Sequence, residues 1–121
     1  MSEIVVVDAA NVVGSRPDGW WRDRAGAARR LHQRLASADI GSVVLVLEGA
    51  ARAGVGEDES DEGNGVRVVH APASGDDAVV EVVGELTDVT VVTSDRELRR
   101  RVEALGARTV GPSWLLDQLP D

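Results

Sequence analysis

Cysteine is absent from this 121-residue chain, and so are lysine, tyrosine and phenylalanine. Without cysteine there is no disulfide framework, no thiolate metal site and no thiol nucleophile, so any metal must be held by oxygen or histidine. The basic residues are all arginine, which excludes every mechanism that needs a lysine. Aromatic residues are limited to Trp20, Trp21 and Trp114, so the core must be aliphatic.

Positive charge is also scarce, because 13 arginines stand against 21 acidic residues and the formal net charge is −8. Neutralising phosphates requires a basic surface, so this balance argues against broad, charge-driven binding of duplex nucleic acid. Much of the negative charge falls in the run from Glu57 to Glu62. We interpret this run as part of a flexible acidic loop, about residues 50–65, which lacks helical periodicity.

Long apolar stretches are missing as well, and the N-terminus has neither a basic region nor a small-residue cleavage site. We therefore expect a cytoplasmic protein with no membrane association. The length fits one domain over residues 1–121, which should bury roughly two-thirds of the surface that the unfolded chain exposes.

Four short runs of β-branched residues predict strands at 4–7, 43–47, 66–69 and 89–92, with a weaker fifth at 108–110. Their near-continuous apolarity indicates burial on both faces, as in a parallel sheet. Patterns of helical period alternate with these runs, at about 22–38, at about 76–86, after Asp95 and after Ser113. The chain is thus predicted to be a three-layer α/β/α, Rossmann-like domain with a mainly parallel sheet of about five strands.

Acidic residues follow three of the predicted strands, at Asp8, Glu48 and Asp95. Ligands of open α/β sheets bind beyond the carboxyl ends of the strands, so we expect these side chains to meet at one edge. Asp77 and Glu81, four residues apart near the start of the second predicted helix, share one of its faces. Unpaired carboxylates raise each other's pKa values, a penalty that a divalent cation removes. Oxygen ligands suit Mg²⁺ or Mn²⁺, which can activate water for phosphodiester hydrolysis.

Structural roles compete with this interpretation, because Ser74 with Asp77, and Ser94 with Glu97, match the capping box of a helix start. For Asp76 and Glu97 we favour the structural role, and for Asp77 the two roles are evenly balanced.

Asp8 is harder to explain structurally, since no helical pattern begins within a turn of it, and we favour a functional role. Asn11 either holds a metal-bound water or a phosphate, or makes the turn toward Gly14. For phosphate contacts the candidates are four arginines, whose alternative role is a solvated helix face: Arg96, Arg99, Arg100 and Arg101.

Three segments together resemble the NYN branch of the PIN-like nucleases, and within it the bacterial YacP-like proteins: VVVDAAN at 5–11, SGDDAVVE at 74–81 and VVTSDREL at 91–98. The resemblance covers nearly the whole chain. It implies a PIN-like fold and a Mg²⁺- or Mn²⁺-dependent ribonuclease, with Asp8, Asp77 and Asp95 as catalytic metal ligands. It also matches Asn11, Glu81 and Ser94 to family positions near the site, whereas Glu48 stands where relatives usually have an aspartate.

The expected partner is RNA, single-stranded in view of the net charge, and the resemblance adds the ribosome as a candidate. The oligomeric state is left open, a homodimer included. Phosphatases and receiver domains with an Asp after the first strand need a lysine, and the glycine-rich motifs of nucleotide-binding folds are absent. The remaining rival is a catalytically silent PIN-like module that binds RNA, the ribosome or a protein partner.

Overall fold

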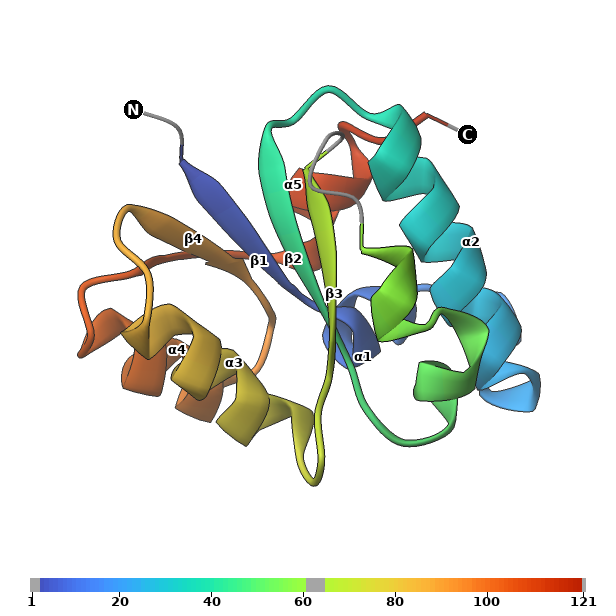
Figure 1. Cartoon of the computed structure of the whole chain (residues 1–121), viewed down its shortest axis with the longest axis horizontal. Coiled ribbons are helices and arrows are strands. Elements are labelled where there is room, and N and C mark those ends of the chain that lie inside the picture. The colour runs from blue at the N-terminus through green and yellow to red at the C-terminus, as the bar shows by residue number, and fades with distance from the viewer. Residues whose placement is uncertain (1–2, 61–64, 121) are drawn as a thin grey trace.

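The computed structural model describes residues 3–60 and 65–120. Five strands form one parallel sheet in the order β3-β2-β1-β4-β5 (Figure 1). The strands are β1 (Ile4–Asp8), β2 (Ser42–Leu47), β3 (Val66–His70), β4 (Val89–Val92) and β5 (Arg108–Val110). Each agrees with its predicted range to within one residue, and the α/β prediction is confirmed.

Helices cover both faces of the sheet, which gives three layers (Figure 1). One face carries α1, α2 and α5, and the other carries α3 and α4. The bounds are α1 (Ala9–Val13), η1 (Trp20–Arg22), α2 (Arg24–Ser37), η2 (Gly49–Gly54), η3 (Glu57–Glu59), α3 (Gly75–Gly84), α4 (Arg96–Glu103) and α5 (Pro112–Leu116), where η marks a 3₁₀ helix.

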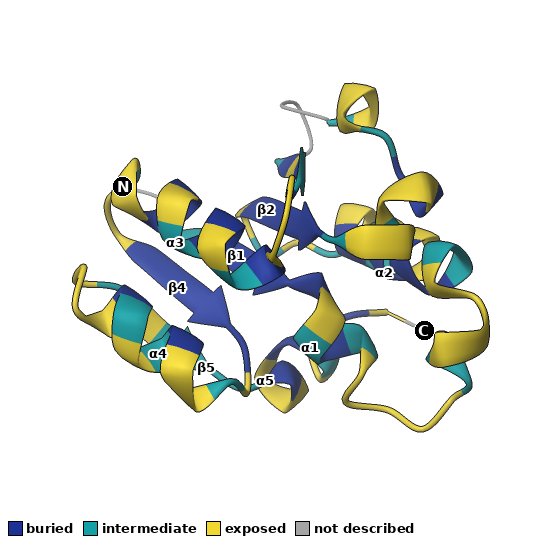
Figure 2. Ribbon diagram, turned by 90° about the horizontal axis from the view of Figure 1, so that it is seen from below, coloured by how far each residue is buried: buried dark blue, intermediate teal, exposed yellow. Residues whose placement is uncertain are grey.

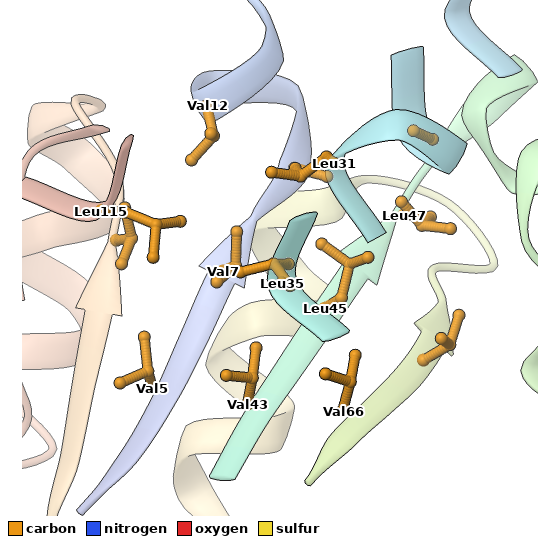
Figure 3. Packing of buried hydrophobic residues seen from close by; sticks show 14 of the residues in the cluster. Val5, Val7, Val12, Leu31, Leu35, Val43, Leu45, Leu47, Val66 and Leu115 are labelled. Carbon is orange, nitrogen blue, oxygen red and sulfur yellow. The ribbon is translucent and has the colours of Figure 1, made fainter. Parts of the chain in front are cut away.

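The core is aliphatic on both sides of the sheet, as the composition requires. On one side, Val7 and Leu45 of the sheet pack with Leu31 and Leu35 of α2 and Leu115 of α5 (Figure 3). All five are at most 4% exposed, and full burial of such a side chain contributes about 1.5–3 kcal/mol. These contacts fix α2 and α5 over the sheet.

The second side of the sheet packs against α3 and α4. Val6 and Val91 contact a cluster that contains Val79 and Val83 of α3 and Leu98 of α4. Figure 2 shows β1, β2 and β4 buried between helices whose outward faces are exposed. Because every strand runs in the same direction, all five carboxyl ends lie along one edge of the sheet.

Helix α1 was not predicted, and the expectation that no helix begins close to Asp8 is wrong. Ala9–Val13 forms a short helix directly after β1, with Asp8 in the N-cap position. The Asp8 side chain makes no capping hydrogen bond there. Its carboxylate is therefore directed to other partners, which are described below.

The prediction of a segment without regular structure at about 50–65 is wrong for its first part. Residues 49–54 and 57–59 form the 3₁₀ helices η2 and η3, and η2 packs on α2. Gly54 permits this close approach, because a Cβ atom there would lie 2.0 Å from the Ala25 carbonyl oxygen. Residues 61–64 of the predicted acidic loop lie outside the described residues.

In the described parts of the chain, no helix has both the length and the apolarity needed to cross a membrane.

Candidate functional site

Asp8 ends the central strand of the sheet and lies between the carboxyl ends of its two neighbours. In the pairing of β1, Asp8 is opposite Val46 of β2, while Val7 is opposite Val92 of β4. Strand β2 pairs with one edge of β1, and β4 pairs with the other edge. Asp8 at the end of β1 therefore lies at the topological switch point of the sheet. Ligands of open α/β sheets bind at this point.

The Asp8 carboxylate is buried, with a residue exposure of 2%, and its Oδ2 oxygen is fixed by two donors. Asn11 Nδ2 donates from 2.5 Å and Thr93 Oγ1 from 3.1 Å. The Oδ1 oxygen accepts no hydrogen bond from a described residue. Among residues 3–60 and 65–120, only one side-chain nitrogen or oxygen is both fully buried and without a hydrogen-bond partner, and it is His32 Nε2. Asp8 Oδ1 is therefore not completely enclosed.

Three further acids lie around Asp8 and influence one another electrostatically. Burial raises the pKa of Asp8, and the negative charges of Asp76 and Glu48 raise it further, against the hydrogen bonds from Asn11 and Thr93. Burial also raises the pKa of Asp76, with added contributions from Asp95 and Glu48. The structure thus brings together Asp8, Glu48, Asp76 and Asp95, which we call the acid cluster.

Glu48 is held at the cluster by the start of α3. Its Oε2 accepts a 2.9 Å hydrogen bond from the backbone N–H of Gly75. A Cβ atom on residue 75 would lie 2.8 Å from Glu48 Oε1, so glycine permits this contact. Glu48 therefore joins β2 to α3 and remains beside Asp8.

Asp76, and not Asp77, is the α3 carboxylate that shares the environment of Asp8. The side chain of Asp77 is 71% exposed and forms a 2.9 Å ion pair with Arg101 of α4. That hydrogen bond, with a smaller contribution from Ser74, lowers the pKa of Asp77. Asp77 therefore lies outside the acid cluster.

Thr93 links Asp8 to Asp95 and was not singled out from the sequence. Its hydroxyl donates to Asp8 and accepts a 3.1 Å hydrogen bond from the backbone N–H of Asp95. Thr93 directly follows β4, just as Asp8 follows Val7 in β1. Because Val7 pairs with Val92, residue 93 lies beside Asp8. A hydroxyl at the end of β4 is the natural donor to that carboxylate.

The capping box predicted for Ser94 with Glu97 is wrong, because the N-cap residue of α4 is Asp95. Its Oδ1 accepts hydrogen bonds from the backbone N–H groups of Glu97 and Leu98, at 2.9 and 3.2 Å. Asp95 Oδ2 takes no part in these bonds, and the negative charge of Asp95 contributes to the raised pKa of Asp76. One carboxylate thus begins the helix and contributes negative charge to the acid cluster.

Asn11 and Ser94 extend the hydrogen-bond network of Asp8. Ser94 Oγ donates to Asn11 Oδ1 at 2.6 Å, while Asn11 Nδ2 donates to Asp8. The amide of Asn11 is therefore oriented from both ends. Its position supports a role at the site more than a role as a simple turn residue.

The remaining predicted residues lie apart from this network. Glu81 is exposed on α3, and Arg96 is exposed at the start of α4 with no described hydrogen bond from its side chain. Three other candidates for phosphate contact are engaged within the fold. Arg99 Nε donates to the Thr93 carbonyl at 3.0 Å, Arg100 pairs with Glu97, and Arg101 pairs with Asp77.

The acid cluster is not a ready-made cage for a metal ion. In residues 3–60 and 65–120, no three acidic or histidine side chains are gathered closely enough to hold a metal by themselves. Mg²⁺ sites commonly use one or two carboxylates and complete the coordination with water and substrate phosphates. The accessible Oδ1 of Asp8 and the neighbouring Asp76 carboxylate have the donor chemistry for a site of this kind.

Comparison with solved structures identifies the fold. Rae1 (YacP) from Bacillus subtilis, in a point-mutant crystal structure, aligns with a TM-score of 0.73 over 95% of this chain and 72% of that chain, at 21% identity. This chain has a YacP-like fold. No family model matches the sequence, and no curated protein matches it either. The YacP-like fold confirms the predicted three-layer architecture, and the resemblance drawn from the three sequence segments agrees with it.

Proposed function

We propose that this chain is a metal-dependent ribonuclease that hydrolyses phosphodiester bonds of single-stranded RNA at the acid cluster. The observation that carries the proposal is the Asp8 carboxylate, buried at the switch point of the sheet, with one oxygen held by donors and the other without a hydrogen-bond partner among the described residues. A buried carboxylate whose pKa is raised by neighbouring acids is costly for the fold. Such groups cluster at functional sites.

We assign the metal ligands to Asp8 and Asp76, with Asp95 beside them, and replace Asp77 by its neighbour. Asp77 is already neutralised by Arg101, whereas Asp76 shares its surroundings with Asp95 and Glu48. Mg²⁺ or Mn²⁺, when bound, supplies an activated water and stabilises the charge on the phosphoryl oxygens.

The surrounding side chains position the acids. Asn11 and Thr93 fix the Asp8 carboxylate, and Ser94 orients the Asn11 amide. Glu48 is tied to the start of α3 through Gly75, so the helix that carries Asp76 keeps its place beside β1. Such supporting contacts typically change metal affinity or activity by 10–100-fold when they are removed.

The test compares two adjacent acids. We expect Asp76→Asn to weaken Mn²⁺ binding in isothermal titration calorimetry and to reduce cleavage of a mixed-sequence single-stranded RNA by roughly 100-fold or more. Asp77→Asn is the matched control and should cut within a few-fold of wild type. The ligand assignment is wrong if Asp77→Asn is inactive and Asp76→Asn is not. The nuclease proposal itself fails if the wild type neither binds metal nor cuts RNA.

A catalytically silent module that binds RNA, the ribosome or a protein partner is the second candidate. It is favoured by the absence of a group of three metal-holding side chains in the described residues and by the net charge of −8. Removal of Asp8 and Asp95 separates the two candidates. Under the first proposal, the double variant Asp8→Asn, Asp95→Asn should lose cleavage. Under the second, the wild type does not cleave RNA and the double variant should still bind the partner.

A further inference from the structure

A cavity of about 320 Å³ adjoins the acid cluster on the α1 side of the sheet. Small apolar residues line it, among them Ala10 of α1 and Ala28 of α2. Trp20, Arg24 and Glu48 line it as well. Glu48 also belongs to the acid cluster, so the cavity and the cluster share this residue.

The cavity suits a flat group with apolar faces and polar edges. Trp20 is half-buried, and its indole ring offers a surface for stacking. The Arg24 guanidinium lies over the same ring, 5.5 Å from its centroid, and forms no ion pair with a described acid. An aromatic wall beside an available cation is the combination that binds a nucleobase together with its phosphate.

A second cavity, of about 390 Å³, lies on the other side of α1 and carries a different charge. Three arginines line it, Arg16, Arg30 and Arg34, against a single acid, Asp18. This local excess of positive charge is notable in a chain with a net charge of −8. We call this cavity the arginine groove.

The two cavities are joined at α1. Val13 lines both of them, and the adjacent residues Ala27 and Ala28 of α2 line one each. A continuous surface therefore runs from the acid cluster, through the Trp20 cavity, to the arginine groove. Along this surface, the acid cluster is followed by an apolar pocket that fits a planar group, and then by arginines that can contact phosphates.

We propose that this surface is the RNA path, with one nucleobase in the Trp20 cavity beside the scissile phosphate and the continuing backbone in the arginine groove. The inference rests on the proposed function for the identity of the ligand. It adds the subsite that orients the strand and the residues that overcome the repulsion of an acidic protein. It also places RNA recognition on α1 and α2 rather than on the arginines of α4.

The test measures binding apart from cleavage. Fluorescence anisotropy of a labelled single-stranded RNA of about 12 nucleotides, in EDTA, reports affinity without hydrolysis. We expect Trp20→Ala to weaken binding about tenfold, while Trp20→Phe keeps most of the affinity because it still stacks. Trp114→Ala is the matched control, because Trp114 lines neither cavity.

A blocking variant guards against loss of fold in Trp20→Ala. Ala10 is exposed in the free cavity, so Ala10→Leu fills the space without removing a native contact. We expect Ala10→Leu to weaken RNA binding by about the same factor as Trp20→Ala. Circular dichroism and the unfolding midpoint of Ala10→Leu should match those of the wild type.

The arginine groove is tested through the salt dependence of binding. Arg30→Ala should reduce the slope of log K against log salt by about 0.7, the value for one phosphate contact on a single strand. Arg29→Ala is the matched control, because Arg29 is the next residue on α2 and pairs with Glu59 instead of lining the groove. Its slope should equal that of the wild type.

The outcomes separate this inference from the proposed function. If wild type cuts RNA but Trp20→Ala, Ala10→Leu and Arg30→Ala bind like wild type, the path is wrong and the nuclease stands. If those variants weaken binding but no metal supports cleavage, the path stands and the nuclease fails. Wild-type protein that does not bind the RNA probe in EDTA overturns the path, and an apolar peptide then becomes the next probe of the cavity.

Discussion

Asp8 is a residue whose ionised form works against the stability of the fold. Its folded-state pKa lies above the ordinary value of 3.8, mainly because of burial and further because of the neighbouring acids. The folded chain holds the Asp8 proton more tightly than the unfolded chain, so stability falls as pH rises from about 3.8 through the raised pKa. Above that pKa the full cost is present.

We therefore predict that Asp8→Asn raises the free energy of unfolding at pH 7. Asparagine keeps an acceptor oxygen for Asn11 and Thr93 but carries no charge. The gain should shrink as pH falls and should vanish below about 3.8, where Asp8 is protonated in both states. Urea unfolding of both proteins across this range measures it. Asp77→Asn, at an exposed and ion-paired acid, should give no such gain, and a pH-independent difference for Asp8→Asn would contradict the argument.

Thr93 is predicted to be a positioning residue for Asp8 and Asp95. Thr93→Val keeps the shape but removes the donor to Asp8 and the acceptor for the Asp95 backbone. We expect a loss of about 1–3 kcal/mol in stability, and an acid limb of kcat/KM shifted to higher pH because the Asp8 pKa loses a hydrogen bond that lowers it.

Thr93→Ser restores the hydroxyl and serves as the control for this prediction. It should return the pH profile to that of the wild type, even though the lost methyl group leaves a small cavity. A merely structural role for Thr93 would predict equal pH profiles in all three proteins, with only the stability changed.

At the scale of elements, the docking of η2 on α2 depends on one glycine. Gly54→Ala would place a Cβ atom 2.0 Å from the Ala25 carbonyl oxygen, so one of the two segments must move. We predict a loss of about 1–3 kcal/mol in the free energy of unfolding. Gly84→Ala is the matched control in α3, because nothing lies within 4 Å of its Cβ position. It should stabilise the chain by about 0.4–1 kcal/mol, and equal urea midpoints for the two variants would contradict this view.

The long elements were predictable because their patterns are long enough to repeat. Valine-rich runs define β1 to β4, and the apolar spacing of α2 over Ala27, Ala28, Leu31 and Leu35 defines its buried face. Helix α1 spans only five residues, which is little more than one turn, and so no periodicity identifies it. The helices η2 and η3 are short 3₁₀ segments held by tertiary contacts that the sequence does not display.

The acid cluster was predicted except for the choice between two adjacent residues. The family resemblance pointed to Asp77, and Glu81 lies one turn further along the same face. That face is the solvent face, since both residues are exposed. Asp76 is followed at three and seven residues by Val79 and Val83, which are buried. Its position on the buried side of α3 was therefore readable from the apolar spacing.

The whole molecule carries excess negative charge, which opposes its own compact state. We predict that the melting temperature rises as NaCl increases from 10 to 150 mM, because screening weakens the repulsion among the acids. The double variant Glu81→Gln, Glu85→Gln removes two exposed charges on α3 and should respond less to salt. Differential scanning calorimetry measures both, and a melting temperature that falls with salt would show that local ion pairs dominate.

The all-parallel sheet gives the molecule two chemically different rims. The acid cluster lies at one rim, whereas β1 begins at the other, close to Glu3, Asp88 and Arg108, which are joined by ion pairs. The five residues of β1 separate the two rims by about 16 Å. A biotin or affinity tag attached ahead of Ile4 should therefore anchor the protein to a sensor chip with its acidic rim turned toward the flowing solution. Surface-based kinetics and single-molecule tethering are thus practical with this chain in one defined orientation.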